Sequence, residues 1–393
     1  MSSERADVVV IGGGCSGTSI AWQLARQGAG RVILLERGSL AGGATGWSSA
    51  IVRTHYTHET LARMALRARH IFEQFAEIVG GECGFQRTGF LALVSSGDAA
   101  AAAANVATHQ RIGIRSSLLT PDQIHQVEPR LNLEGVGAAV WEPDSGYADP
   151  HGTTMGYAAA ARRHGAELRL GVTVRAIGHD QHGVTSVESD AGRINTRTVV
   201  VAAGYRTGAL VAPLGLELPL TPIRHAIAII HRTASFGPRH PIVSDRVLGS
   251  YYRPEGAGMS MIGTTAAHEG REDQAVEEES APTLEEEGTL FERFCSRFPG
   301  QEQAAAQRGY TGVYDCTPDL QPMLGATAIP GLHLAVGFSG HGFKLSPVVG
   351  ELIATNILHG ADAAADLALF QPGRFATGQL IQATHSYRVG TLG

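Results

Sequence analysis

The sequence predicts a mixed α/β protein with two domains, one built on parallel strands and the other on an antiparallel sheet. Residues 6–36 show the order strand, glycine turn, helix, strand, and both strands are short apolar runs typical of a buried parallel sheet. Residues 198–204, TVVVAAG, form a late strand of the same kind. Residues 218–263 instead contain alternating segments such as IRHAIAII, which indicate antiparallel strands of another sheet. A length of 393 residues corresponds to about 2.6 domain-sized units, and two domains are enough.

The order of the other elements supports this division. Apolar residues at helical spacing place the first helix at residues 16–27, between the two N-terminal strands. Three short strands over residues 171–204 suit a small meander that returns the chain to the first sheet. Thr283 followed by Glu286 fits a capping box, which predicts that a helix begins there. Further helices are expected at residues 58–79, 99–104 and 149–166, and a short one within residues 120–131 that stops before Pro129.

Composition and charge exclude several classes of protein. The 31 basic and 37 acidic residues give a net charge of −6, which is no electrostatic basis for binding nucleic acid. The four cysteines contain no CxxC pair and no metal-ligand spacing, so we expect reduced thiols, no metal site and a cytoplasmic protein. The uncharged stretch 8–25 contains GGGCSGTS, and its glycines and hydroxyls do not suit a membrane span or a signal sequence.

A dinucleotide-binding fingerprint lies in the N-terminal βαβ unit. Gly12-x-Gly14-x-x-Gly17 joins the first strand to the helix, and Glu36 ends the second strand. Gly12 allows the tight turn, Gly14 lets the backbone approach a pyrophosphate, and Gly17 lets helix and strand pack closely. The helix N-terminus offers free N–H groups to the phosphates, and Glu36 offers a carboxylate to a ribose hydroxyl. The fingerprint indicates a Rossmann-like domain and leaves NAD and FAD both open.

Four further segments favour a flavin. Residues 42–53, GGATGWSSAIVR, form a glycine- and hydroxyl-rich loop that suits a second phosphate or the isoalloxazine edge. The strand at 198–204 ends in small residues. Residues 314–325 precede the segment 331–354, in which a strand leads through glycines into a second helix N-terminus. Together these segments favour FAD as the cofactor.

The sequence resembles the D-amino acid oxidase superfamily of flavoproteins, and within it the branch of sarcosine oxidase and dimethylglycine dehydrogenase. The motifs that carry the resemblance are spread over the whole chain. They are the N-terminal fingerprint, Arg53, GYADP at 146–150, VVVAAG at 199–204, YDCTPD at 314–319 and GFSGHGFK at 337–344. The last of these is the most specific.

The resemblance implies a discontinuous FAD-binding domain and an antiparallel sheet that covers the flavin. The FAD-binding domain would comprise residues 1–80, 150–214 and 306–393, and the substrate-binding domain residues 81–149 and 215–305. The residues expected to contact FAD are Gly12, Gly14, Cys15, Ser16, Gly17, Glu36, Arg37, Gly43, Ala44, Ser48, Ser49, Val174, Ala203, Gly204, Gly340, His341, Gly342, Phe343 and Lys344.

The resemblance also implies that Arg53 and Lys344 hold the carboxylate of an amino acid substrate. Two cations near a flavin would orient that carboxylate and leave the amine-bearing carbon over the ring. His341, between two glycines, either contacts the ring or packs within its turn. Tyr251 and Tyr252 are adjacent on a predicted strand, so only one of them can face the flavin side, where it would line the pocket. Simple packing in the core is the alternative for both tyrosines.

Three departures from the family pattern concern the flavin. The cysteine that bonds to FAD in monomeric sarcosine oxidases falls here near Gly312, and Cys316 is offset, so noncovalent FAD is expected. The lysine that promotes reaction with oxygen in those enzymes falls near Met261, which leaves the electron acceptor open between oxygen and another redox partner. His151 lies one residue from the position that carries FMN in heteromeric beta subunits, so a second flavin is a minor alternative.

The expected function is therefore FAD-dependent oxidation of the C–N bond of a small secondary or tertiary amino acid, such as sarcosine, to an imine that water hydrolyses. The nearest alternative is an oxidase or dehydrogenase of D-amino acids, glycine or cyclic imino acids on the same fold. A noncatalytic flavin-binding assembly protein and an NAD-dependent dehydrogenase are further alternatives. The expected partners are the substrate and an electron acceptor, with the chain a monomer or part of a hetero-oligomer, and neither nucleic acid nor a membrane.

Overall fold

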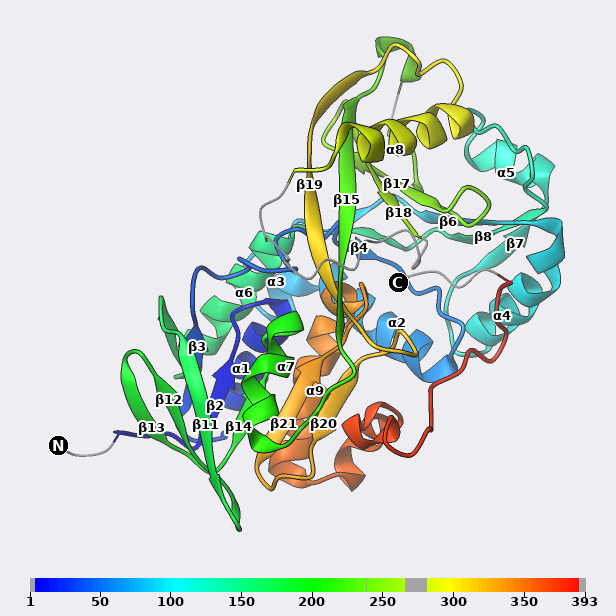
Figure 1. Cartoon of the computed structure of the whole chain (residues 1–393). Helices are drawn as coiled ribbons and strands as arrows, with labels where there is room; N and C mark the ends of the chain where they lie inside the picture. The colour runs from blue at the N-terminus through cyan, green and yellow to red at the C-terminus, as the bar shows by residue number, and fades with distance from the viewer. Residues whose placement is uncertain (1–3, 238, 266–280, 389–393) are drawn as a thin grey trace.

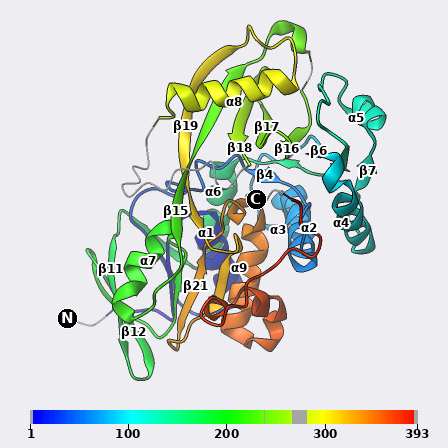
Figure 2. The same ribbon diagram turned by 45° about the vertical axis from the view of Figure 1, so that its right-hand side comes forward.

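The computed structural model describes residues 4–237, 239–265 and 281–388 (Figure 1). Within them, a six-stranded sheet and an eight-stranded sheet form the two main layers of strands. Figures 1 and 2 show that the long strands β15 (Thr221–His231) and β19 (Ala305–Cys316) run from the second sheet toward the helices of the first. The predicted mixed α/β class, with one mainly parallel and one mainly antiparallel sheet, is confirmed.

The six-stranded sheet has the order β10-β3-β2-β14-β21-β20, and all neighbouring pairs are parallel except β20 with β21. Its strands are β2 (Val8–Ile11), β3 (Val32–Glu36), β10 (Glu167–Leu170), β14 (Val199–Val201), β20 (Met323–Ala326) and β21 (Leu332–Val336). The central strands are almost entirely Val, Ile and Leu because both of their faces are buried.

Successive residues of β2 show what covers each face of this sheet. Val8 and Val10 pack into the cluster that contains the helices, whereas Val9 and Ile11 pack with the small meander. The helices on the first face are α1 (Cys15–Arg26), α6 (Pro150–Arg163) and α9 (Gly342–His359). The meander on the second face is a sheet of β1 (Glu4–Arg5), β11 (Val174–Asp180), β12 (Gly183–Ser189) and β13 (Gly192–Asn195). The predicted βαβ unit and meander are confirmed.

The eight-stranded sheet has the order β19-β15-β18-β17-β16-β6-β8-β7, and only β6 with β16 is parallel. Its other strands are β6 (Phe90–Val94), β7 (Ser117–Leu119), β8 (Ala138–Glu142), β16 (Ile242–Asp245), β17 (Ser250–Glu255) and β18 (Met259–Thr264). Helix α8 (Leu284–Arg297) covers one face through Leu290 and Phe294. The predicted capping box starts this helix, since Thr283 Oγ1 accepts from Glu286 N at 3.2 Å and Glu286 Oε2 accepts from Thr283 N at 2.7 Å.

The remaining elements connect the two sheets. A three-stranded sheet joins β4 (Ile51–Val52), β9 (Gly146–Tyr147) and β5 (Gln86–Arg87). The helix expected over residues 58–79 breaks at Gln74, whose ψ of 29° is not helical. The helices here are α2 (Glu59–Glu73), α3 (Phe75–Ile78), α4 (Ala99–Arg111), α5 (Pro121–Val127) and α7 (Thr207–Val211).

The division of the chain into two domains stays a prediction, and one strand bears on it. β19 pairs along its length with β15 in the eight-stranded sheet, although its residues 306–316 fall in the part assigned to FAD binding. A break at residue 306 would thus cut the eight-stranded sheet. None of the described helices combines the length and the apolar run that a membrane crossing requires.

Candidate active site

The glycine turn between β2 and α1 is shaped by backbone packing. Gly12 has φ +115°, a conformation that favours glycine, and a Cβ there would overlap the carbonyl of Ala202 after β14. A Cβ on Gly17 would overlap the carbonyl oxygen of Gly12, so α1 lies directly against the turn. Gly14 is the N-cap of α1 and supplies no side-chain cap, so the helix begins with backbone N–H groups and a positive dipole end. This geometry fits a pyrophosphate.

Glu36 holds the same turn from the end of β3. Its Oε2 accepts from Gly13 N at 2.6 Å, and its Oε1 accepts from Gly38 N at 2.8 Å. The carboxylate is half-buried beside the glycine turn, where the fingerprint predicts it. Its binding of a ribose hydroxyl stays a prediction.

The loop that follows β3 meets the start of α1 through a residue that the sequence did not single out. Thr45 Oγ1 accepts from Cys15 N at 3.1 Å and donates to the Cys15 thiol at 3.4 Å. It also lies 3.0 Å from the position that a Cβ on Gly14 would take. The hydroxyl-rich composition of residues 42–53 is the signal that pointed to this loop, but the composition alone could not distinguish Thr45 from its neighbours.

A pocket lies where this loop, the eight-stranded sheet and the start of α9 meet. Its empty space, including its open mouth, measures about 580 Å³. The lining residues are Ser48, Ser49, Ile51, Arg53, Phe90, Ser244, Tyr251, Thr264, Thr265, Tyr314, Gly340, Phe343 and Lys344. Seven of these were predicted as site residues, from the 42–53 loop, β17 and the GFSGHGFK motif.

Arg53 and Lys344 are the two cations of this pocket. Both are buried, with 5% and 6% of their surface exposed. The guanidinium carbon of Arg53 lies 4.6 Å from the ring centroid of Tyr56, and Lys344 Nζ lies 5.9 Å from the same centroid. Burial, with Arg53 nearby, holds the pKa of Lys344 well below its usual value. The described lining residues include no Asp or Glu, so the pocket is suited to an anionic group.

His341 lies behind the pocket wall and not on it. Its Nδ1 is 3.0 Å from the hydroxyl of Tyr56, and the two rings stack with centroids 5.3 Å apart. Burial, with Lys344 and Arg53 nearby, holds the pKa of His341 well below its usual value, so the ring is neutral. Tyr56 thus contacts both cations and His341, and it is a second residue that the sequence did not single out.

The two adjacent tyrosines of β17 point to opposite sides of the sheet, as a strand requires. Tyr251 lines the pocket. Tyr252 packs against Phe294 and Phe298 beneath α8, and its hydroxyl donates to the carbonyl of Arg293 at 3.1 Å. The prediction of Tyr252 as a site residue is therefore wrong, since its side chain belongs to the core on the far face.

The turn that leads into α9 is held by Asp315, at the end of β19. Its Oδ2 accepts from Gly337 N at 2.6 Å, and its Oδ1 accepts from Phe338 N at 3.2 Å. Burial still raises the pKa of Asp315 to about 6. The YDCTPD motif contains this residue, but the sequence did not indicate that it supports the second glycine motif.

The positions where this chain departs from the family pattern lie around the same region. A Cβ on Gly312 would lie 3.3 Å from the Cβ of Trp47, and Met261 is buried in a cluster with Ile227 and Tyr251. Cys316 packs in a buried cluster with Ile223, and burial raises the pKa of its thiol to about 12. His151 is exposed at the start of α6 and faces Gly46 of the loop.

The other predicted cofactor residues lie in α1, α9 and β11 and in the segments after β3 and β14. Cys15 and Ser16 are buried in the first turn of α1, and Gly342 opens α9. Arg37, Gly43 and Ala44 are exposed and follow β3. Val174 begins β11, and Ala203 and Gly204 follow β14. Three features together fit an FAD molecule. They are the glycine turn with no room for a Cβ, the start of α1, where Gly14 provides no side-chain cap, and the adjoining pocket. Contacts of individual residues with FAD stay predictions.

Comparison with known proteins points the same way. A family model described as FAD dependent oxidoreductase (DAO) matches residues 7–355. Rat mitochondrial dimethylglycine dehydrogenase is 28% identical over 98% of this chain, and sarcosine oxidase subunit beta of an Arthrobacter species is 28% identical over 95% of this chain and 92% of its own. The chain spans only 46% of the length of the rat protein.

Solved structures resemble most of the chain. The L-proline dehydrogenase of P. horikoshii superposes with a TM-score of 0.88 and 27% identity, over 96% of this chain and all of that one. The glycine oxidase of Geobacillus kaustophilus superposes with a TM-score of 0.77 and 25% identity, over 90% and 94% of the two chains. The family match covers most of the chain and includes the glycine turn and the residues of the pocket. The chain therefore belongs to the DAO family of FAD-dependent oxidoreductases, whose cofactor is FAD.

Proposed function

We propose that the protein binds FAD noncovalently and oxidises the C–N bond of a small secondary or tertiary amino acid to an imine or iminium, which water then hydrolyses. The observation that carries the proposal is the pair of buried cations, Arg53 and Lys344, in a pocket whose described lining has no carboxylate. A substrate carboxylate placed there would restore the charge balance of the site. Relatives named for dimethylglycine and sarcosine support this class of substrate.

The residues that would hold FAD lie along the glycine turn, the loop of Thr45, and the start of α9. Bound FAD supplies the two-electron acceptor for the oxidation. Arg53 would bind the substrate carboxylate through charge-assisted hydrogen bonds, and the added negative charge would raise the pKa of Lys344 again, so that both cations engage the substrate. Apolar side chains such as Ile51, Phe90 and Tyr251 line the rest of the pocket and suit an N-alkyl group.

Oxidation of a cyclic imino acid is the second candidate. It is supported by the similarity to the L-proline dehydrogenase, which extends over 96% of this chain. The same two cations would serve it, because proline also pairs a carboxylate with a secondary amine. The two candidates differ in the substrate that reduces the flavin fastest.

The purified yellow protein would be mixed anaerobically with sarcosine, N,N-dimethylglycine, L-proline, glycine and D-alanine, and the visible flavin absorbance recorded. Fast bleaching by the N-methyl compounds supports the first candidate, and fast bleaching by L-proline supports the second. A protein whose flavin none of these amines bleaches would contradict both. Oxygen or an artificial electron acceptor is added afterwards to identify what reoxidises the flavin.

The carboxylate-binding role is tested with Arg53→Ala and Lys344→Ala. Losing one charge-assisted interaction of about 1.5–3 kcal/mol should weaken the apparent affinity about 10- to 100-fold in each variant. Arg308→Ala is the matched control, since Arg308 is exposed on β19. The substrate amide, which lacks the negative charge, should bind the wild type poorly and lose little in the variants. Unchanged affinity for the carboxylate substrate in both variants would overturn the proposed role.

A further inference from the structure

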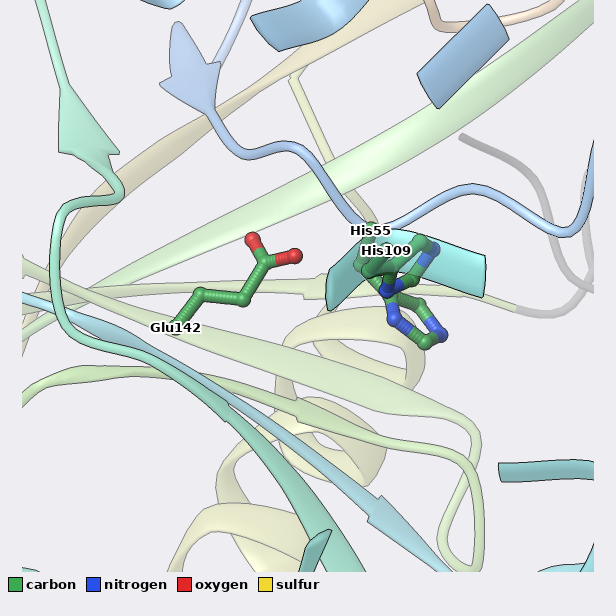
Figure 3. Close-up of side chains that lie close together, drawn as sticks. All are labelled: His55, His109 and Glu142. Atoms are coloured by element: carbon green, nitrogen blue, oxygen red, sulfur yellow. The ribbon is translucent and has the colours of Figure 1, made fainter. Parts of the chain in front are cut away.

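A second cluster of polar side chains lies beside the pocket but contributes nothing to its wall. His55 follows Arg53 after β4, His109 lies in α4, and Glu142 ends β8. All three are buried, with 2%, 0% and 1% of their surface exposed, and one potential ligand atom from each lies within 4.8 Å of the others. Figure 3 shows the carboxylate of Glu142 pointing toward the two imidazole rings.

Each of the three side chains is oriented by a hydrogen bond at one atom and has no hydrogen-bond partner at another. His109 Nε2 donates to the carbonyl of Tyr56 at 2.8 Å, and His55 Nε2 lies 2.9 Å from the hydroxyl of Tyr387. Glu142 Oε2 accepts from Thr54 N at 2.9 Å, and also from a serine hydroxyl. The atoms left without a partner are His55 Nδ1, His109 Nδ1 and Glu142 Oε1.

This arrangement requires an additional group. Because a carbonyl can only accept, the proton of His109 is on Nε2 and its Nδ1 presents a lone pair. A buried carboxylate oxygen and an imidazole nitrogen without partners are costly in the interior. A water molecule donates only two hydrogen bonds, so it satisfies the cluster only if His55 carries its proton on Nδ1. A cation satisfies all three atoms when His55 has the same tautomer as His109.

We propose that His55, His109 and Glu142 form a binding site for a divalent transition-metal ion such as Zn²⁺. Two imidazole nitrogens and one carboxylate oxygen are a common ligand set for Zn²⁺, and hydrogen bonds at the opposite ring nitrogens are the usual support of such ligands. Ligand atoms around a tetrahedral Zn²⁺ lie roughly 3.4 Å apart. The three residues would therefore move together by about 1 Å or less each on binding, a shift within the reach of side-chain rotation.

The charged groups around the cluster indicate a moderate affinity for a metal ion. Arg246 and Arg53 lie near His55. The same two arginines oppose an added positive charge, which limits the affinity.

The role of the ion would be structural. It would join α4 and β8 to the segment 53–56, in which Arg53 lines the pocket and Tyr56 packs against Arg53. Metal binding would thus stabilise the position of Arg53 without contacting substrate or FAD. The proposed metal site differs from the expectation of no metal site. That expectation rested on cysteine spacing, which gives no information on ligands that lie 54 and 33 residues apart in the chain.

The full-length protein, with any affinity tag removed, would be treated with a chelator, reloaded with Zn²⁺ and freed of excess metal by gel filtration. Elemental analysis should then give about one Zn²⁺ per chain, and X-ray absorption should show nitrogen and oxygen ligands without sulfur. The reloaded protein should unfold at least about 2 °C above the chelated protein. These measurements do not depend on turnover.

Two variants and two controls make the test specific. His109→Ala and Glu142→Gln should each lower the bound Zn²⁺ at least tenfold. Glu142→Gln preserves the shape of the side chain, so it still tests the site if His109→Ala folds poorly. His125→Ala and Glu134→Gln, at exposed positions, should bind as the wild type does. Wild-type protein with less than 0.1 Zn²⁺ per chain, or variants that retain a full equivalent, would overturn the site. A water molecule would then be the occupant.

Discussion

A single added methyl group at Gly17 should weaken FAD binding. Gly17 lies in the first turn of α1, and a Cβ there would come about 1.4 Å inside ordinary contact with the Gly12 carbonyl oxygen. Gly17→Ala would gain about 1 kcal/mol from helix propensity, but overpacking against a fixed backbone costs about 1–3 kcal/mol or more. To relieve the overlap, α1 must shift away from the turn that would hold the pyrophosphate. We expect a net loss of about 1–2 kcal/mol in the free energy of unfolding, and at least a tenfold loss of FAD affinity.

Gly288→Ala is the matched control, because Gly288 also lies inside a helix, α8, and a Cβ there would contact nothing within 4 Å. It should raise the free energy of unfolding by about 1 kcal/mol, or the melting temperature by about 1–2 °C in a chain of this length. The ratio of flavin to protein absorbance gives FAD content, and thermal unfolding of the FAD-free protein gives stability. If Gly17→Ala bound FAD normally and melted as Gly288→Ala does, the proposed packing of α1 on the turn would be wrong.

Three further outcomes are expected. The pKa of Asp315 is raised from 3.8 to about 6, so the folded protein binds this proton more tightly than the unfolded chain does. The free energy of unfolding should therefore fall by about 3 kcal/mol between pH 4 and 6 because of this group, and stay flat above pH 6. Urea titrations should show that Asp315→Asn removes this pH dependence. Tyr252→Phe loses one hydrogen bond and should cost about 1 kcal/mol of stability with unchanged substrate affinity, whereas Tyr251→Phe should change the affinity and not the stability, as paired melting and substrate titrations would show. Thr45→Val leaves Cys15 N without its acceptor and should lower FAD occupancy severalfold in the absorbance ratio, while Thr45→Ser, which keeps the hydroxyl, should not.

Local patterns in the sequence were sufficient to predict the elements that position the cofactor. The fingerprint at Gly12, the meander and the capping box at Thr283 each depend on residues close together in the chain, so propensity and spacing determine them. The break at Gln74 was not predictable, because the apolar pattern of residues 58–79 continues through it.

Features that depend on distant contacts were beyond the sequence. Strand alternation showed that only one of Tyr251 and Tyr252 could face the pocket, but which one is decided by α8, some 40 residues later. Thr45, Tyr56 and Asp315 support the site through partners in other segments. Thr45 and Asp315 lie in segments that the sequence marked, but spacing along the chain does not reveal their partners.

The path of β19 has a consequence for how a substrate enters. This strand belongs to the eight-stranded sheet, yet its last residues tie through Asp315 to the turn that starts α9. The wall of the pocket formed by the eight-stranded sheet is thus joined directly to the wall formed by the start of α9, with no flexible linker between them. We therefore expect the two sheets to stay together during turnover and the mouth of the pocket to keep a constant width. A series of substrates with lengthening N-alkyl groups should show a sharp limit of size.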